Sequence, residues 1–320
     1  MADIRFRIGS SISRREFLAL GAGIGVAAAF RGAPASAAAG PILTRAIPRT
    51  GERLPVVGLG TAIVFDIGDD AARRVERRAV IHTMLEGGGR VIDTAPSYGT
   101  AEVVVGDLLA AMQSRDKVFL ATKVRAARRE AAIAEMEQSL QRLRSDKLDL
   151  MQIHNPGSDA GATAAQLGLL REWKDKGVFR YIGVTHFQAA ANERLIELMR
   201  REKLDFVQVN YSMAERSVEQ RLLAAAAETG TAVLINLPFA RGKLFSAVRG
   251  QPVPAWAAEF EAASWGQFFL KYVLAHEAVT CVIPGTDKPE YMLDNLNAGR
   301  GRLPDAAMRR KMTGFLDSLR

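Results

Sequence analysis

The sequence predicts an α/β fold, a (β/α)8 TIM barrel preceded by an N-terminal β-hairpin. Three observations support this prediction. Short apolar runs rich in β-branched residues alternate along the chain with segments of helical periodicity. From the second run to the seventh, the strand starts recur roughly every 26 to 31 residues, the length of one strand, one helix and two turns. Ahead of the second run, residues 45–60 read as two short strands joined by a turn at Gly51.

Eight strands and eight helices are expected after this hairpin. An open doubly wound sheet is the alternative, but it would show a G-x-G-x-x-G phosphate loop after its first strand, where residues 61–64 read TAIV. The expected strands are residues 59–62, 90–94, 118–123, 148–154, 179–185, 206–209, 232–237 and 280–284. The expected helices are residues 70–86, 101–112, 129–143, 164–176, 188–199, 218–228, 265–276 and 288–297, with a last one at 304–319.

The N-terminus differs in kind from the rest of the chain. A basic start, an apolar run at residues 17–30 and the small residues ASA at 35–37 follow the order of a secretory signal peptide. SRREFL at residues 13–18 resembles the twin-arginine signal, whose export machinery carries folded proteins. We expect residues 1–37 to be a signal, too short and glycine-rich for a stable membrane span. Residues 38–320 would be a barrel domain in the periplasm, or in the cytoplasm if the signal is not used.

Composition argues against several other classes of protein. The formal net charge is +8, but basic and acidic residues are interleaved, as in residues 71–78, which favours solvated helix faces over a nucleic-acid site. The single cysteine, Cys281, lies in an apolar run and is expected to be a buried small hydrophobe. The 4 histidines show no metal-binding spacing, and no G-x-S-x-G nucleophile motif is present.

Polar residues stand at the ends of three consecutive expected strands. Asp93 ends the second strand, Lys123 the third and His154 the fourth. Tyr98 follows Asp93 in a loop. Because the strands of a barrel all end at one mouth, these four side chains are expected to converge there. Taken singly, each has a structural alternative: a helix cap, an exposed charge, a core histidine and a rim-packing aromatic, respectively.

The charges of these residues suggest proton donation to a carbonyl group. A nearby ammonium favours the phenolate form of a tyrosine, so Tyr98 beside Lys123 could donate a proton near neutral pH. Asp93 would keep Lys123 charged and aimed. His154 would hydrogen-bond the oxygen of the bound carbonyl. Such a site has no reductant of its own, so it needs a cofactor that supplies hydride.

The four residues resemble, in order and position, the Asp, Tyr, Lys and His tetrad of the aldo-keto reductases. The resemblance covers residues 43–319. It implies an NADP-dependent oxidoreductase that reduces aldehyde or ketone carbonyls to alcohols, with hydride from NADPH and the proton from Tyr98. NAD is a possible cofactor. The alternative is a nucleotide-binding sensor on the same barrel with weak or no turnover.

The resemblance also implies a cofactor site. In the family a Ser-Asn pair holds the nicotinamide carboxamide; here Thr185 keeps the hydroxyl, while His186 could donate from a ring nitrogen. Gln208 would contact the same carboxamide, and Tyr211 would stack on the nicotinamide ring. The implied cofactor residues are Gly60, Thr61, Asp93, Thr185, His186, Gln208, Tyr211, Leu237, Pro238, Phe239, Gly242, Gly285, Thr286, Lys288 and Asn295.

The adenosine end of this implied site departs from the family pattern. A common form of the segment has a lysine at the position of Gly285 and an arginine at the position of Tyr291, the latter gripping the 2′-phosphate of NADPH. Thr286 and Lys288 would take over the phosphate here. Substrate choice would rest on residues 64–69, 155–163 and 241–264, whose aromatic side chains would suit an apolar or aryl aldehyde: Phe65, Phe245, Trp256 and Phe260.

Overall fold

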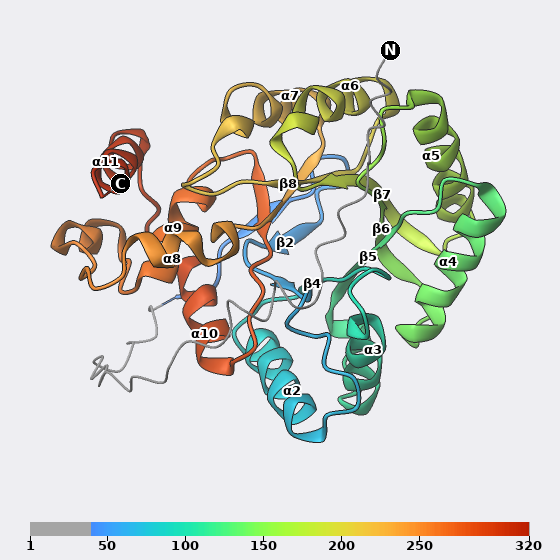
Figure 1. Ribbon diagram of the computed structural model, residues 1–320, viewed down its shortest axis with the longest axis horizontal. Helices are drawn as coiled ribbons and strands as arrows, with labels where there is room; N and C mark the ends of the chain where they lie inside the picture. Colours follow the sequence, from blue (N-terminus) through green and yellow to red (C-terminus); the bar gives the residue numbers. More distant parts are fainter. Residues whose placement is uncertain (1–39, 320) are drawn as a thin grey trace, which may run out of the picture. The chain divides into compact units, whose positions relative to one another are not determined.

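The computed structural model describes residues 40–319 and shows a (β/α)8 barrel, as the sequence predicts. The expected signal at residues 1–37 lies outside the described residues. Eight parallel strands form one sheet in the order β10-β9-β8-β7-β6-β5-β4-β3, and helices surround it on the outside (Figure 1). An antiparallel pair, β1 and β2, precedes the barrel, which confirms the expected hairpin.

Most element bounds agree with the periodicity of the sequence. The strands are β1 Thr44–Ala46, β2 Arg53–Pro55, β3 Leu59–Gly60, β4 Val91–Asp93, β5 Phe119–Val124, β6 Leu148–His154, β7 Phe179–His186, β8 Phe206–Asn210, β9 Ala232–Asn236 and β10 Val279–Val282. The α-helices are α2 Ala71–Glu86, α3 Ala101–Ala111, α4 Arg129–Arg142, α5 Ala160–Asp175, α6 Asn192–Glu202, α7 Leu222–Thr229, α8 Lys243–Ala247, α9 Trp265–Leu274, α10 Pro289–Ala298 and α11 Ala306–Asp317. Helix α8 and the 3-10 helix η5, Ala255–Phe260, were not expected and lie in the long seventh loop.

The barrel closes where its first and last strands meet. Isolated bridges join Val57 to Val282 and Gly60 to Gly285, in place of a continuous ladder. The backbones approach so closely that a Cβ on Gly60 would lie 2.6 Å from the carbonyl oxygen of Ile283. The expected first strand at residues 59–62 is shorter than predicted, because its ladder with β4 ends at Gly60, opposite Asp93, the last residue of β4.

Arg77 fastens the same seam from the outside. Its side chain projects from α2 and is only 2% exposed. Nε donates to the carbonyl oxygen of Val64 at 2.6 Å, and Nη1 donates to that of Asp287 at 2.7 Å. One guanidinium thus holds the loop after β3 against the loop after β10.

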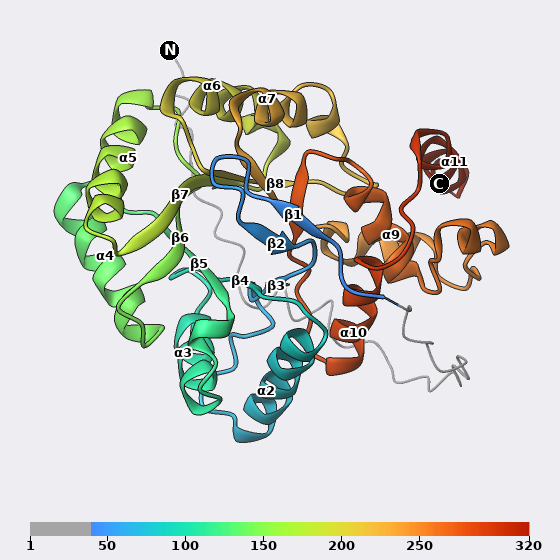
Figure 2. The same cartoon turned by 180° about the vertical axis from the view of Figure 1, so that it is seen from behind.

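The inside of the barrel is apolar below its mouth. Alternate residues of each strand face inward, because successive side chains point to opposite faces of a strand. The hairpin contributes Ile47 and Leu54 to this inner cluster and covers the end of the barrel where the strands begin (Figure 2). The other inward residues include Val91, Phe119, Leu150, Phe206 and Cys281. Polar inward residues therefore occur above this plug, near the opposite end.

Candidate active site

Asp93 and Lys123 form a buried ion pair at the mouth end of the barrel. In the ladder Asp93 pairs with Ala121, so Lys123 lies one inward position further along β5 and its long side chain reaches across to β4. Nζ of Lys123 donates to Oδ1 of Asp93 at 2.5 Å and to the carbonyl oxygen of Thr94 at 2.8 Å. The two side chains are 3% and 1% exposed, respectively. This arrangement is the one expected from the sequence.

The ammonium of Lys123 is held in its charged form. Burial alone would lower the pKa of Lys123, but the negative charge of Asp93 and the interactions with Asp93 and the Tyr98 hydroxyl outweigh burial and raise that pKa above its ordinary value. Nζ lies 4.9 Å from the centre of the Tyr98 ring. A permanent positive charge therefore stands against the phenol.

Tyr98 and His154 share one side of the mouth. Tyr98 is positioned by the loop after β4, where its N–H donates to the carbonyl oxygen of Ala95 at 3.1 Å. The Tyr98 and His154 rings meet edge to face, with centroids 5.9 Å apart and planes at 86°. Nδ1 of His154 lies 3.5 Å from Oγ of Ser97. The structure thus brings together all four residues expected at the catalytic centre.

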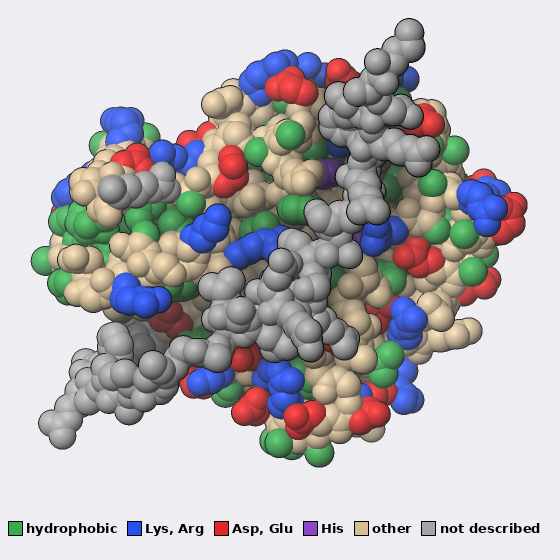
Figure 3. Space-filling model, viewed as in Figure 1, with side chains coloured by type: hydrophobic (Ala, Val, Ile, Leu, Met, Phe, Trp, Pro, Cys, Tyr) green, Lys and Arg blue, Asp and Glu red, His purple; other side chains and the backbone are tan. Residues whose placement is uncertain are grey.

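His154 is neutral at any physiological pH. Burial, followed by the positive charges of Lys123 and Arg125, lowers the pKa of His154 to about 3. A neutral imidazole keeps one N–H donor, and so it can donate a hydrogen bond without carrying charge into the site. Figure 3 shows His and Lys or Arg side chains reaching the surface near the centre of the face of the barrel opposite the hairpin.

A layer of amide side chains supports the ion pair, and part of it was missed in the sequence. Nε2 of Gln152 donates to Oδ2 of Asp93 at 3.0 Å, and Nε2 of Gln208 donates to the same oxygen at 2.8 Å. Gln208 was expected to bind cofactor, whereas Gln152 was not singled out. The signal was its position two residues before His154 in β6, which places both side chains on the same face of the strand.

This geometry can be compared with that of known proteins. The family model described as Aldo/keto reductase family matches residues 56–311. This chain belongs to the aldo/keto reductase family. The match confirms the resemblance inferred from the four strand-end residues, and it makes the chain an NAD(P)H-dependent oxidoreductase acting on carbonyl groups.

Several known proteins are similar to this reductase. A methylglyoxal reductase of Escherichia coli, YeaE, is 33% identical over 236 residues, 72% of this chain and 80% of its own. An NADH-specific methylglyoxal reductase of Escherichia coli is 29% identical over 230 residues, 63% of this chain and 68% of its own. The crystal structure of an aldo-keto reductase from Klebsiella pneumoniae in complex with NADPH has a TM-score of 0.69 at 27% identity, covering 84% of this chain and 92% of that one.

The strand ends next to the tetrad carry polar atoms with unused hydrogen-bonding capacity. Asn210 ends β8 and Asn236 ends β9, paired in the ladder. The Oδ1 atoms of both, and of Asn155 after β6, are buried without a partner among the described residues. An unpaired buried oxygen is costly unless a ligand or water satisfies it. These residues therefore fit the amide and hydroxyl groups of a nicotinamide cofactor.

His186 keeps one ring N–H that can serve as a hydrogen-bond donor. Its Nδ1 accepts a hydrogen bond from the N–H of Gln188 at 3.1 Å, and burial lowers the pKa of His186. The proton of the neutral ring therefore sits on Nε2. The neighbouring Thr185 donates its hydroxyl to Oε1 of Gln208 at 3.1 Å.

The loop after β9 has an unusual backbone. Leu237, Ala240, Arg241 and Gly242 all have positive φ, between 50° and 84°. Non-glycine residues in this region are strained and concentrate at functional sites, and turns of this kind direct backbone N–H groups at anions. The expected pyrophosphate loop, which also contains Pro238 and Phe239, thus has a backbone suited to that role.

The segment proposed for the adenosine end leads into α10. Thr286 is buried, and Lys288 stands at the helix N-cap with Nζ 5.6 Å from the centre of the exposed Tyr291 ring. Asn295 is buried further along the same helix. Gly60, Thr61 and Gly285 lie at the seam, where Thr61 donates its hydroxyl to the carbonyl oxygen of Asp93 at 3.0 Å. The seam requires the glycine at position 60 whether or not cofactor contacts it.

The hydroxyl of Tyr211, the residue expected to stack on the nicotinamide ring, points away from the tetrad. It is completely buried, and its hydroxyl donates to Oε1 of Glu219 at 2.5 Å while accepting from Nη2 of Arg309 at 2.7 Å. Glu219 also accepts from the hydroxyl of Tyr272 at 2.7 Å. The hydrogen bonds of Tyr211 therefore tie the end of β8 to helix α11 and lead away from the tetrad.

The expected aromatic wall is not formed as predicted. Phe65 and Phe260 are buried at 0% and 2% exposure, so neither is available to a substrate. Trp256 packs against Phe260 and Phe268, with centroids 6.2 and 5.6 Å apart. Phe245 is exposed at 41%, and Trp256 is half-buried. The Trp256 and Phe260 rings pack against Phe268 of α9, and Trp256 also packs against Phe315 of α11, because burial of their large apolar area is favourable there.

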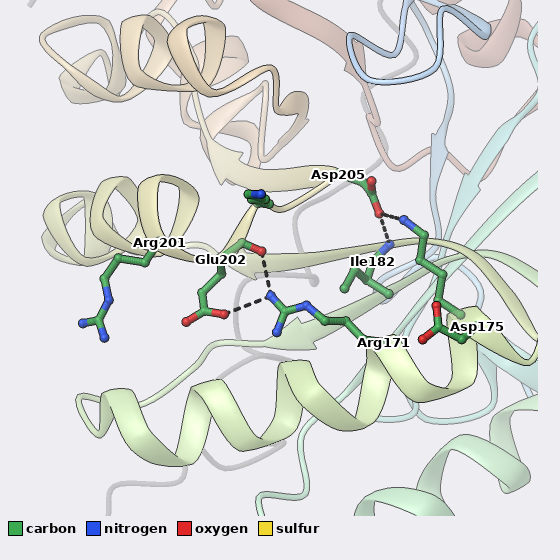
Figure 4. A pocket seen from close by; sticks show the side chains of 8 residues that line it. Arg171, Asp175, Ile182, Arg201, Glu202 and Asp205 are labelled. Carbon is green, nitrogen blue, oxygen red and sulfur yellow. Dashed lines mark hydrogen bonds and ion pairs between the residues drawn. The ribbon is translucent and has the colours of Figure 1, made fainter.

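A separate hollow of about 500 Å³ lies at the opposite end of the barrel, where α5 and α6 end and β8 begins (Figure 4). Arg171 pairs with Glu202 at 2.9 Å, and Lys174 pairs with Asp205 at 2.6 Å. Two of the four cations that line this hollow, Arg171 and Lys174, are therefore paired with carboxylates, and the hollow lies at the end of the barrel away from the tetrad. Within residues 40–319, no helix is long and apolar enough to cross a membrane, and no cluster of His, Cys, Asp and Glu could hold a metal ion.

Proposed function

We propose that this aldo/keto reductase uses NADPH to reduce small aldehydes and ketones, with Tyr98 as proton donor and Lys123, Asp93 and His154 preparing the donation. The buried Lys123 ammonium between Asp93 and Tyr98 carries this assignment. Bound reduced nicotinamide would supply the hydride that becomes part of the product alcohol.

Each residue has a separate task in this proposal. The N–H of neutral His154 donates to the carbonyl oxygen and fixes its direction beside Tyr98. Tyr98 then gives its proton to that oxygen as negative charge develops there, and Lys123 stabilises the phenolate that remains. Asp93 keeps Lys123 charged and directed at the ring. The same oxygen therefore receives one hydrogen bond, from His154, and one proton, from Tyr98, which lowers the barrier where negative charge accumulates.

Several features support NADPH as the cofactor and methylglyoxal as the first substrate to test. The free oxygens of Asn210 and Asn236, the donor at His186 and the loop 237–242 would hold the nicotinamide and pyrophosphate. Thr286 and Lys288 would meet the 2′-phosphate. The Klebsiella pneumoniae structure contains NADPH, and the relatives include methylglyoxal reductases, one of them NADH-specific.

The test is a comparison of cofactors and of turnover. Protein fluorescence is titrated with NADPH and with NADH, and absorbance near ~340 nm is then followed with methylglyoxal and with 4-nitrobenzaldehyde. We expect tighter binding of NADPH and consumption of the nicotinamide with at least one carbonyl. Binding of NADPH without oxidation by either compound would contradict the proposed function and favour a sensor.

We also propose that residues 1–37 direct export by the twin-arginine machinery, supported by SRREFL at residues 13–18. Because that pathway carries folded proteins, the reductase could cross with its cofactor bound. Fractionation of cells that express the full chain should place it in the periplasm with residues 1–37 removed. Replacement of Arg14 and Arg15 by lysine should retain it in the cytoplasm, and an unchanged distribution would contradict export.

A further inference from the structure

We propose that Gln152 and Gln208 are positioning residues of this reductase: together they hold the Asp93 carboxylate so that Lys123 stays aimed at Tyr98. The inference rests on the proposed function of the tetrad. It adds a supporting shell that comes from β6 and β8, neither of which adjoins β4 in the sheet.

The two oxygens of Asp93 have separate duties. Oδ1 accepts only from Lys123 among the described hydrogen bonds, at 2.5 Å. Oδ2 accepts from Gln152 at 3.0 Å and from Gln208 at 2.8 Å. Because Oδ2 accepts hydrogen bonds from two directions, the carboxylate cannot rotate without losing at least one of these two hydrogen bonds. The two glutamine amides therefore fix the Asp93 carboxylate, and the fixed carboxylate sets the direction of the Lys123 ammonium.

The orientation of the Gln208 side-chain amide is fixed by its four hydrogen bonds. Nε2 of Gln208 has two hydrogens, and it donates to Asp93 and to Oε1 of Gln152 at 3.1 Å. Oε1 of Gln208 accepts from the hydroxyl of Thr185 at 3.1 Å and from Nδ2 of Asn236 at 3.3 Å. Both donors and both lone pairs of this amide are used, so its orientation is fixed. Because Gln208 already holds Gln152, Nε2 of Gln152 is left to face Asp93.

The surroundings offer no substitute for these contacts. Gln152 and Gln208 are 0% and 1% exposed. Inward residues below them, including Leu150, Phe206 and Cys281, belong to the apolar inner cluster. Burial and the nearby Asp93 charge raise the pKa of Cys281, so its thiol stays neutral. Within residues 40–319, Oδ2 of Asp93 accepts its hydrogen bonds from the two amides, so we expect a carboxylate released by them to move toward Lys123 or the mouth.

The four hydrogen bonds of Gln208 also limit how it could contact a cofactor. Gln208 could bind a nicotinamide carboxamide only by giving up one of its four hydrogen bonds. Asn236 uses its Nδ2 on Gln208 but keeps Oδ1 without a partner, so it is the better placed acceptor. Gln208 therefore belongs to the support of Asp93 before it belongs to the cofactor.

Two substitutions of Gln152 test the inference, since this residue has no proposed cofactor contact. Gln152→Met removes the donor and should lower kcat roughly 10- to 100-fold, by misplacing the catalytic pair, with the affinity for NADPH within about twofold of wild type. Gln152→Glu can still donate while protonated but repels Asp93 once ionised. Its kcat should be near that of wild type at low pH and fall as pH rises, in a new titration that wild type lacks.

Gln267→Glu is the matched control. Gln267 is another buried glutamine that donates to an aspartate, with Nε2 2.7 Å from Oδ1 of Asp294, between α9 and α10. Both Glu variants should lose stability as pH rises, because each buried acid has a raised folded-state pKa. Only Gln152→Glu should show the additional fall of kcat with rising pH. A purely structural role predicts that neither does.

The outcomes separate the inference from the function beneath it. An active wild type whose Gln152→Met kcat and Gln152→Glu pH profile match its own would overturn the inference alone. A wild type that binds NADPH but reduces no carbonyl compound would overturn the proposed function and this inference with it. The additional fall of kcat with rising pH in Gln152→Glu, absent from Gln267→Glu, is the supporting result.

Discussion

The ring of Tyr98 meets the ring of His154 edge to face, with centroids 5.9 Å apart and planes at 86°. In the proposed function, these two hydrogen-bonding side chains act at one point in the mouth. A carbonyl oxygen at that point would receive a hydrogen bond from the neutral imidazole and the proton of the phenol. The pair therefore defines where a substrate must place its reacting group.

Removal of the phenol should abolish proton donation and leave binding intact. We expect Tyr98→Phe to lower kcat by about 10²- to 10⁴-fold, because general acid catalysis typically contributes that much. The affinity for NADPH, measured by fluorescence titration, should stay close to that of wild type. Retention of more than a tenth of the wild-type kcat would show that another group supplies the proton.

Disruption of the Asp93–Lys123 pair should cost stability as well as activity. Lys123→Met leaves a buried carboxylate without its cation, and such a loss typically costs about 3–5 kcal/mol of unfolding free energy. Asp93→Asn combined with Lys123→Met should be less destabilised than Lys123→Met alone. Urea unfolding of wild type, both single variants and the double variant measures this coupling, and additive losses would argue against it.

His154 should make the stability of the protein sensitive to acid, while the pH profile of its activity should show no titration of a histidine at about pH 6.5. Its folded-state pKa of about 3 lies below its ordinary value, so the folded state binds fewer protons than the unfolded state below about pH 6.5. Stability should be lost as pH falls from about 6.5 toward 3. We expect His154→Gln to lose less stability than wild type between pH 7 and pH 5, by roughly 2 kcal/mol. Equal losses would show that His154 protonates normally in the fold.

The seam at Gly60 should tolerate no side chain. A Cβ there would lie 2.6 Å from the backbone oxygen of Ile283, so Gly60→Ala should destabilise the barrel by about 1–3 kcal/mol. Gly168→Ala is the control, because nothing lies within 4 Å of its Cβ and the residue is inside helix α5. That variant should gain up to about 1 kcal/mol. Thermal unfolding of the two variants provides the comparison.

Lys288 should distinguish the two nicotinamide cofactors. If its ammonium meets the 2′-phosphate, Lys288→Met should weaken NADPH binding about tenfold, the effect of losing about 1.4 kcal/mol, and leave NADH binding unchanged. Lys311→Met is the matched control, since Lys311 on α11 also lies over an aromatic ring, with Nζ 4.5 Å from the centroid of Trp256. Equal weakening of both cofactors would place Lys288 away from the phosphate.

The barrel and the positions of its catalytic residues were predictable because both depend on local patterns. Strand and helix periods are visible in the chain, and in β5 and β6 the alternation of faces puts Lys123 and His154 on the inward side near the strand ends. The parallel barrel then brings such ends to one mouth. No further information was needed to group them.

What could not be predicted depends on partners that no local pattern announces. Gln152 sits in an apolar run, and its bond to Asp93 spans from β6 to β4, two strands away in the sheet. The phenol of Tyr211 finds Glu219 and Arg309, the latter on a helix at the far end of the chain. The sequence likewise does not say whether a loop aromatic such as Phe260 lines a cavity or fills the core.

The guanidinium of Arg77 reaches carbonyl groups of Val64 and Asp287, which are separated by most of the chain. A ribosome delivers Arg77 and Val64 early and Asp287 only near the end of synthesis. Until then the growing polypeptide holds an open array of strands whose first edge lacks its final neighbour. The barrel can therefore close only late in synthesis, when Arg77 can bind the loop after the last strand as well as the loop after the first.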